Sequence, residues 1–354
     1  MKIFGSACQV RGLIWKHRDF PLTMALNELK ASSYDMSNRV NLCLIVVTYN
    51  SQETIRECLD ALISQCLSTD EILVYDNGSS DDTPKILKNY EANVSLQLSA
   101  SNLGFSYACN WCAQKATQAS HLAFINPDAI VGLDLVHRAR ETLADGSISL
   151  VGFSCKDING SQDKNFRRYP GVLSGVLTII DSVTCRFKFK SSGRFDLNKH
   201  YLDGSCMFID RSMFLSANQF QDFFLYGEDV ILCHALKQKS IKAIYHSDVF
   251  YVHLRGASSN STAGERSWSM LPNMVYSELY FLRSRTLFSR GAYLILRFIE
   301  LVALVLVSQI FFSKNKVKKT FFTKRLLLLL QYSLSFFIQG KGFSKPEFHV
   351  VPKK

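Results

Sequence analysis

Proline and glycine are scarce in this chain of 354 residues, which contains 7 prolines and 18 glycines. That composition excludes a collagen-like or low-complexity protein, and the 47% of hydrophobic residues excludes a wholly disordered chain. No internal repeat with a period of about 20–50 residues is visible, so a repeat architecture is not indicated. We therefore expect one or two globular domains that bury a sizeable core.

A secretory signal is also lacking, because polar and charged residues interrupt the first 20 positions, where a signal needs about 7–15 continuous apolar residues. Without export, we expect the ten cysteines to stay reduced and to serve mostly as small core residues. Cys109 and Cys112 have CxxC spacing, but no second pair or histidine cluster completes a zinc site. Their spacing favours two cysteines on one face of a helix.

Excess positive charge is absent from most of the chain. It is confined to residues 283–354, which carry 14 Lys+Arg against two acids. Within them, residues 291–312 are mostly apolar but are interrupted by charges, and residues 313–325 hold six basic groups before the apolar run 326–338. This pattern favours a helical tail on an anionic membrane surface over a spanning helix. A packed helical subdomain or a dimer interface is the alternative. Nucleic acid is disfavoured, because no aromatic-interleaved basic groove accompanies the cluster.

Strand and helix patterns alternate along the middle of the chain. Residues 41–50, 71–75 and 121–125 are short apolar runs bounded by turn formers, which predict strands buried on both faces. Residues 51–67 and 84–90 show the spacing of helices. This alternation predicts an α/β fold with a doubly wound, mostly parallel sheet, in which ligands bind at the carboxyl ends of the strands.

Polar segments follow these strands. In DNGSSDDT, Asp76 could accept the imide N–H of uracil or thymine, although such a segment is also a common turn. The segment 102–110 combines a glycine turn with amides where a nucleoside could dock, or forms an ordinary loop.

Four further residues could carry chemistry. Asp128 follows an apolar strand and a proline, and could bind a divalent ion together with phosphates or cap a helix. Glu228 and Asp229 are adjacent carboxylates after an aromatic run, which suits a general base with a raised pKa or the acidic start of a helix. His253 ends a strand-like run and is either a metal ligand or a surface residue.

The order of these segments is more specific than any one of them. VTYN, DNGSSDDT, NLGFSYACN, INPDA, LDGSCMFID, FFLYGEDVILC and YVHLRGASS follow one another over about residues 40–260, with FRRYP at 166–170. This series resembles the family 2 glycosyltransferases with a GT-A fold. In particular, it is similar to the bacterial rhamnosyltransferases that build surface polysaccharides such as O-antigen, capsule or lipopolysaccharide.

The resemblance implies roles for individual residues. The nucleotide pocket would comprise Thr48, Tyr49, Asn50, Asp76, Asn102 and Gly104. A Mg or Mn ion would be held by Asp128 and His253, although Asn126 occupies the first position of the DxD-type motif and leaves one carboxylate. Asp229 would be the catalytic base, with Glu228 as its neighbour. The sugar and acceptor pocket would comprise Asp203, Gly204, Arg255 and Ser258.

The resemblance further implies an inverting, metal-dependent transferase, a hexosyltransferase that moves rhamnose from dTDP-rhamnose to a lipid-linked oligosaccharide or polysaccharide. It would be cytoplasmic, peripheral on the inner face of the cell membrane, with an extension at 1–38, a GT-A domain at 39–282 and the tail at 283–354. Two alternatives remain open: transfer of another sugar, such as galactofuranose from a UDP donor, or a non-catalytic membrane-associated nucleotide-binding or scaffold protein. A nucleotidyltransferase is disfavoured, because VTYNSQET lacks a glycine-rich basic loop.

Overall fold

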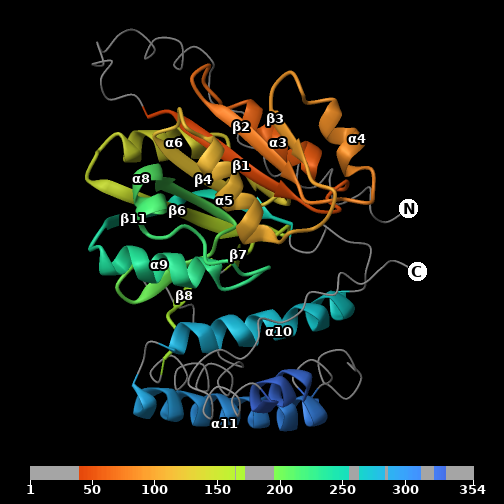
Figure 1. Ribbon diagram of the computed structural model, residues 1–354, viewed down its shortest axis with the longest axis vertical. Coiled ribbons are helices and arrows are strands. Elements are labelled where there is room, and N and C mark those ends of the chain that lie inside the picture. The colour runs from red at the N-terminus through yellow and green to blue at the C-terminus, as the bar shows by residue number, and fades with distance from the viewer. Residues whose placement is uncertain are drawn as a thin grey trace.

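A computed structural model describes residues 40–163, 165–171, 195–254, 263–283, 286–311 and 323–331. The predicted extension at 1–38, Arg255 and Ser258 lie outside the described residues. An α/β layer occupies the upper part of Figure 1, and a layer of long helices lies beneath it.

The sheet is built from strands β1 (Leu42–Thr48), β2 (Glu71–Asp76), β3 (Ser95–Leu98), β4 (His121–Ile125), β5 (Ala129–Val131), β6 (Ile148–Lys156), β7 (Gln162–Asp163), β10 (Cys206–Asp210) and β11 (Lys242–His253). Within the described residues these nine strands form one sheet in the order β3-β2-β1-β4-β10-β6-β11-β5, with β7 paired to β6. A separate two-stranded sheet joins β8 (Phe166–Arg168) to β9 (His200–Leu202).

Strand directions confirm the predicted mostly parallel sheet. β1, β2, β3 and β4 run parallel to one another, and β6 runs parallel to β11. Three strands reverse the direction: β10 is antiparallel to β4 and β6, β5 is antiparallel to β11, and β7 is antiparallel to β6. The strands predicted at 41–50, 71–75 and 121–125 are confirmed as β1, β2 and β4.

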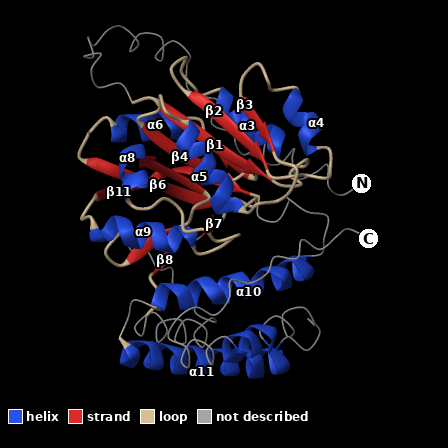
Figure 2. Cartoon of the chain, viewed as in Figure 1, coloured by secondary structure: helices blue, strands red, loops and turns tan. Residues whose placement is uncertain are grey.

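The helices are α3 (Ile55–Ile63), α4 (Thr83–Lys88), α5 (Phe105–Lys115), α6 (Leu135–Leu143), α8 (Arg211–Ser216), α9 (Glu228–Gln238), α10 (Ala263–Leu282) and α11 (Leu287–Phe311). Another helix covers residues 323–331. In Figure 2 the helices of the upper part surround the sheet. The helices predicted at 51–67 and 84–90 are confirmed as α3 and α4, but α3 begins at Ile55 because the preceding residues form a turn.

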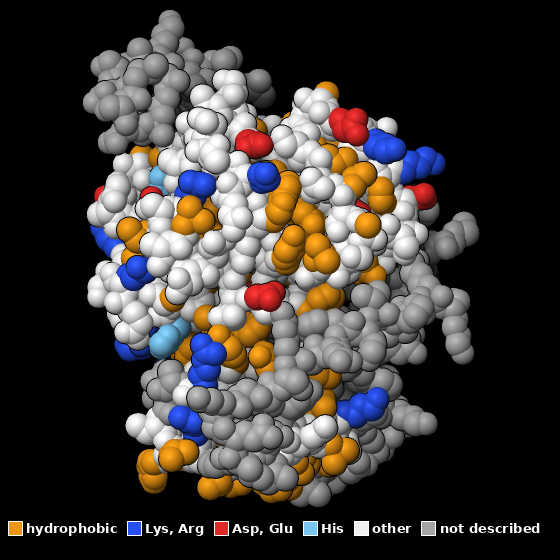
Figure 3. All heavy atoms as spheres, in the orientation of Figure 1, with side chains coloured by type: hydrophobic (Ala, Val, Ile, Leu, Met, Phe, Trp, Pro, Cys, Tyr) orange, Lys and Arg blue, Asp and Glu red, His pale blue; other side chains and the backbone are white. Residues whose placement is uncertain are grey.

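The C-terminal helices are joined by a buried charge network. Glu278 of α10 accepts hydrogen bonds from the Tyr293 hydroxyl (2.5 Å) and Arg297 Nε (2.7 Å) of α11, and from Arg325 Nη2 (3.3 Å). Arg297 also pairs with Glu300. The charges that interrupt the apolar run therefore face inward, and Figure 3 shows hydrophobic side chains along the lower rim, where α11 lies in Figure 1. Among the described residues, no helix is both long and apolar enough to cross a membrane.

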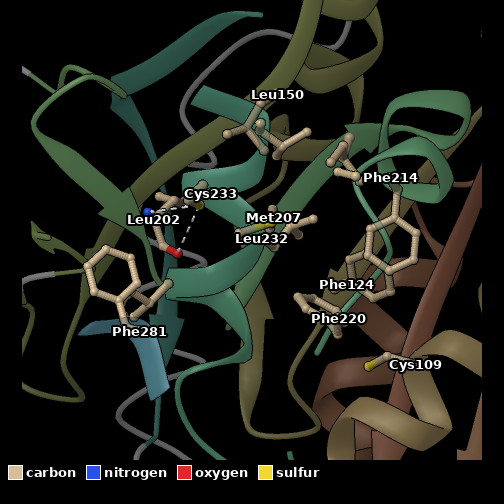
Figure 4. Packing of buried hydrophobic residues seen from close by; sticks show 14 of the residues in the cluster. Cys109, Phe124, Leu150, Leu202, Met207, Phe214, Phe220, Leu232, Cys233 and Phe281 are labelled. Carbon is tan, nitrogen blue, oxygen red and sulfur yellow. Dashed lines mark hydrogen bonds between the residues drawn. The ribbon is translucent and has the colours of Figure 1, made fainter. Parts of the chain in front are cut away.

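Two clusters of buried residues cover the two faces of the sheet. In β1, Cys43 and Ile45 belong to one cluster and Leu42 and Leu44 to the other. Since side chains alternate along a strand, a strand buried on both faces needs the unbroken apolar run that the sequence shows. Figure 4 shows part of the first cluster, in which the rings of Phe124, Phe214 and Phe220 pack with centroids 4.8–5.2 Å apart.

The cysteines contribute to this core. The eight cysteines of the described residues are free, and seven of them are buried. Cys109 and Cys112 both lie on α5, where burial raises the pKa of each thiol well above its usual value. The CxxC segment is therefore a pair of core residues, as the missing zinc partners suggested.

Candidate active site

The parallel strands bring distant polar segments to one edge of the sheet. Thr48 is the register partner of Asp76, and Val46 is the partner of Ile125. β1, β2 and β4 therefore end side by side, and the loops that follow them share the carboxyl edge. Thr48, Tyr49, Asn50, Asp76 and Asp128 lie on or next to these strand ends, whereas Asn102 and Gly104 lie in the loop that follows β3.

Asp76 organises the first half of the predicted nucleotide pocket. Its carboxylate is almost completely buried and accepts hydrogen bonds from the Thr48 hydroxyl (2.8 Å), the Ser79 amide (3.0 Å) and the Ser79 hydroxyl (2.5 Å). Asn50 joins the same loop, because its amide donates to Ser79 Oγ (2.8 Å) and its side-chain oxygen accepts from the Ser80 amide (2.8 Å). Thr48, Asn50 and Asp76 are thus one connected unit, with Tyr49 half-buried between the first two.

Asn102 and Gly104 lie in the loop that leads into α5. Gly104 has a φ of 95°, and a Cβ there would come within 2.9 Å of the Phe224 backbone. The Phe105 amide also donates to the Phe224 carbonyl (2.7 Å), and the Asn102 side chain accepts from the Gly104 amide (3.0 Å). Only glycine combines this backbone conformation with so close an approach. Close packing against Phe224 therefore explains the glycine at position 104, in addition to its predicted binding role.

The register of β5 and β11 brings Asp128 and His253 together. His253 is the partner of Ala129, so it lies beside Asp128, and His253 Nε2 is 3.1 Å from Asp128 Oδ1. Both residues are buried, at 6% and 8% exposure. Burial lowers the pKa of His253, but the hydrogen bond and charge of Asp128 outweigh this and raise it to about 10.

This pair fits part of a metal site. Two ligand atoms each about 2.1 Å from one octahedral ion, at a right angle, lie about 3.0 Å apart, close to the observed separation. No group of three or more His, Cys, Asp or Glu residues arranged for a metal ion occurs in the described part of the chain. Asp128 and His253 would therefore hold an ion only together with ligands from a substrate or water.

Asp203 and Asp229 form a second acidic centre. The Asp203 amide donates to the Asn165 carbonyl (2.7 Å), and its carboxylate accepts from the Ser205 amide (3.1 Å). A Cβ at Gly204 would be 3.8 Å from the Asp229 Cβ, so Gly204, one of the predicted sugar-pocket residues, lies directly against the predicted base. Asp203 also interacts electrostatically with His253. It therefore connects the Asp128–His253 pair with Asp229.

The two carboxylates at the start of α9 have different surroundings. Asp229 is half-buried; burial and the charge of Asp203 raise its pKa to about 7, against the opposing charge of Arg167. Glu228 is buried, its Oε2 has no hydrogen-bond partner, and burial and Asp229 raise its pKa well above normal. It also interacts with Cys109 in the core. A pKa near neutral pH suits a general base, so the surroundings of Asp229 agree with its predicted role. Glu228, the preceding residue, is buried.

Several residues that support this site carried no individual prediction. Tyr251 shares a 2.6 Å hydrogen bond between its hydroxyl and that of Ser205, and Asn165 fixes Asp203. Asn77 accepts from the Leu103 amide (2.8 Å) and ties two loops of the nucleotide pocket together. Arg167 faces the acidic centre. Asn77, Arg167 and Tyr251 lie within the segments DNGSSDDT, FRRYP and YVHLRGASS, but those signals pointed to the segments rather than to these residues.

This sheet, with its polar strand ends and an acidic helix start, has the expected GT-A fold. Residues 43–216 match the model of glycosyl transferase family 2. The chain is 30% identical over 155 residues to the uncharacterized glycosyltransferase EpsJ of Bacillus subtilis, covering 43% of this chain and 44% of that relative. It is 24% identical over 241 residues to the N-acetylglucosaminyl-diphospho-decaprenol L-rhamnosyltransferase of Mycobacterium tuberculosis, covering 62% and 77%.

Among solved structures, the mannosyltransferase PcManGT of Pyrobaculum calidifontis, in complex with GDP-Man and Mn²⁺, has a TM-score of 0.51 at 17% identity. That similarity covers 95% of this chain and 97% of that one, and supports the fold. The chain spans less than half the length of the first two curated relatives that it matches. The match identifies residues 43–216, about half of the chain, as a family 2 glycosyltransferase domain, and it supports the expected enzyme class.

Proposed function

We propose that this protein is an inverting glycosyltransferase that moves rhamnose from dTDP-rhamnose to a hydroxyl group of a lipid-linked acceptor. The observation that carries the proposal is the position of Asp229. It is half-buried at the start of α9, has a pKa of about 7, and lies next to Asp203, which interacts with the Asp128–His253 pair. The proposed base is thus linked through Asp203 to His253, which belongs to a pair suited to a diphosphate-bound ion.

In the proposed reaction, the acceptor oxygen attacks the anomeric carbon while the bond from that carbon to the diphosphate breaks on the opposite face. Asp229 accepts the proton of the attacking hydroxyl, so the configuration inverts and a nucleoside diphosphate leaves. Asp128 and His253 would hold a Mg or Mn ion, which when bound offsets the charge of the leaving diphosphate. Asp203 and Gly204 would line the sugar side of the site.

The choice of donor rests on two supports. The mycobacterial relative is named for transfer of L-rhamnose to a diphospho-decaprenol acceptor, and the alignment covers 77% of its length. Asp76, at the end of β2, would accept the imide N–H that thymine and uracil share. A UDP-linked sugar such as galactofuranose therefore stays an alternative, and a panel of dTDP- and UDP-sugars tested for binding with Mn²⁺ separates the two.

The test of the catalytic proposal is Asp229→Asn. The amide keeps the size of the side chain but cannot take the proton, so transfer should fall about 10²–10⁴-fold while dTDP binding is unchanged. Asp248→Asn is the matched control, because Asp248 is an exposed carboxylate on β11 and should leave the rate unaltered. Normal turnover by the Asp229→Asn variant refutes the assignment.

The outer face of α11 supports attachment to a membrane surface. Its inner face carries Arg297 and Glu300 in the Glu278 network, whereas Leu287 and Ile295 are 67% and 61% exposed. Among the described side chains of α11, Phe288, Phe298 and Ile299 are also large, apolar and exposed. Polar groups inside and apolar groups outside suit contact with lipid, and the six basic residues at 313–325 would add attraction to an anionic leaflet. We propose peripheral binding to the inner face of the cell membrane.

This surface can be tested with full-length protein and vesicles of phosphatidylcholine with or without phosphatidylglycerol. Moving one large apolar side chain from water into lipid contributes about 1.5 kcal/mol, so Leu287→Glu with Ile295→Glu should weaken vesicle binding at least 100-fold. Leu67→Glu with Leu133→Glu is the matched control, because both leucines are exposed on the upper domain. Equal binding by both double variants contradicts a lipid-facing α11.

A lipid-linked acceptor agrees with the position of α10. A Cβ at Gly227 would lie 2.3 Å from the Ser277 Cβ, so the residue before Glu228 and Asp229 touches α10 directly. α10 is in turn joined to α11 through Glu278. The proposed base and the proposed membrane surface are therefore parts of one packed unit, which suits a substrate held in the same membrane.

A further inference from the structure

We propose that Arg167 is a positioning residue of the transfer reaction and acts as the counter-charge of the carboxylate pair Asp203 and Asp229. The inference rests on the proposed role of Asp229 as the base. It assigns a function to the small sheet of β8 and β9, which lies outside the main sheet and carries none of the predicted nucleotide residues.

The β8–β9 sheet fixes the position of the Arg167 side chain. Arg167 is the central residue of β8 and the register partner of Tyr201 in β9, and their side chains are hydrogen-bonded. Asn165, just before β8, accepts the amide hydrogen of Asp203, just after β9, at 2.7 Å. The strand that carries Arg167 is therefore tied to the loop that carries Asp203 close to the cross-strand pair.

The acidic centre needs such a counter-charge. Among the described residues, the titratable and charged groups that interact with Asp229 are Arg167 from β8, Tyr201 from β9, Asp203 from the following loop, and Glu228 and Cys233 from α9 itself. Of these, Arg167 is the one cation. It interacts with both Asp203 and Asp229, so a single guanidinium offsets the charge of Asp203 that raises the pKa of Asp229.

The direction of the effect follows from the charges. Burial and Asp203 raise the pKa of Asp229 to about 7, and Arg167 acts in the opposite sense. Without Arg167, the base would titrate at higher pH and would be protonated in most molecules at neutral pH. Nearby opposite charges shift a pKa by about 1–3 units. Arg167 is exposed, so water screens its charge. We therefore expect loss of Arg167 to raise the pKa of Asp229 by about one unit. At a pH below that pKa, the ionised fraction of Asp229 would then be about tenfold smaller than in the unchanged protein.

The test compares Arg167→Met, Arg167→Lys and Arg168→Met in the full chain. Arg168→Met is the matched control, because adjacent residues of a strand point to opposite faces. Titration of ¹³C-labelled aspartate carboxyls by NMR, with Asp229→Asn used to assign the signal, reads the base without any substrate. We expect the titration midpoint of Asp229 to rise by about one pH unit in Arg167→Met. In Arg167→Lys and Arg168→Met it should stay near that of the unchanged protein.

Kinetics with dTDP-rhamnose provide the second measurement. In Arg167→Met the acid limb of kcat/KM should move upward by the same amount, with the high-pH plateau within about threefold of normal and dTDP affinity unchanged. An unmoved NMR midpoint, or an equal loss of rate at every pH, overturns the inference and leaves Arg167 a structural residue. Failure of the proposed function is distinguished by the Asp229→Asn variant, which would then keep normal turnover whatever Arg167 does.

Discussion

Glu278 offers a quantitative test of the C-terminal helical unit. Its carboxylate is buried at 9% exposure and pairs with Arg297 and Arg325 while accepting the Tyr293 hydroxyl. Burial alone would raise the pKa of Glu278, but the two arginines dominate and lower it from 4.5 to about 2. The side chain is therefore held in its charged form by contacts that join all three helices.

The magnitude follows from linkage. A pKa lowered from 4.5 to about 2 corresponds to roughly 3 kcal/mol of stabilisation from the charged form. Because the folded pKa lies below the unfolded one, this contribution is complete above about pH 4.5 and is lost as the pH falls towards 2. Glu278→Gln removes the charge and keeps the shape. It should lower the opening free energy of the unit by roughly 3 kcal/mol at pH 7, and by about half as much at pH 3.

Amide hydrogen exchange followed by mass spectrometry measures this unit apart from the rest of the chain. In Glu278→Gln, peptides from α11 should exchange about 100-fold faster at pH 7, with a difference of about tenfold at pH 3, while β1 peptides stay unchanged. The matched control is Glu141→Gln, because Glu141 is exposed on α6 beside His137 and its loss should change neither set. Unaltered α11 exchange at pH 7, or a difference that persists fully at pH 3, refutes the proposed role of the network.

Three further results are expected. Gly227→Ala should reduce turnover at least tenfold and destabilise the fold by more than about 1 kcal/mol, measured by urea unfolding, because φ is 92° and Ser277 occupies the space of a Cβ. Asp76→Asn should weaken dTDP binding about tenfold by calorimetry, since the amide disrupts the acceptor set for Thr48 and Ser79; unchanged affinity contradicts this. Removal of divalent ions with EDTA should abolish transfer, and Mn²⁺ should restore it; full activity in EDTA excludes the ion.

The strands that shape the nucleotide side of the site were predictable because each is a local pattern. A strand buried on both faces requires an apolar run such as residues 42–48, and parallel strands end at the same edge. Asp76 could therefore be placed near Thr48 before any coordinates were known. The antiparallel direction of β10 could not be predicted in this way, because a run such as CMFID gives no indication of its neighbours or its direction.

The Asp128–His253 pair marks a different limit. The two residues are 125 positions apart, and they meet only because β11 pairs with β5 in one register, with His253 opposite Ala129. A shift of that register by one residue would turn His253 to the other face. The sequence connected them through the resemblance to a family, whereas the physical link depends on a pairing of strands that no local pattern specifies. The same holds for Arg167, whose position depends on the pairing of β8 with β9.

The tail shows how a hydropathy reading along the chain loses information that helical geometry retains. Arg297 and Glu300 lower the hydropathy of the run and argue against a spanning helix, but they are three residues apart and so lie on one face. Tyr293 and Leu301, which are buried, share that side of α11, whereas Leu287, Ile295 and Ile299 are exposed. Because Glu278 and Arg325 satisfy the inward charges, the outward face is free to be apolar. The same two charged residues that make spanning costly therefore make a helix that lies on a membrane physically reasonable.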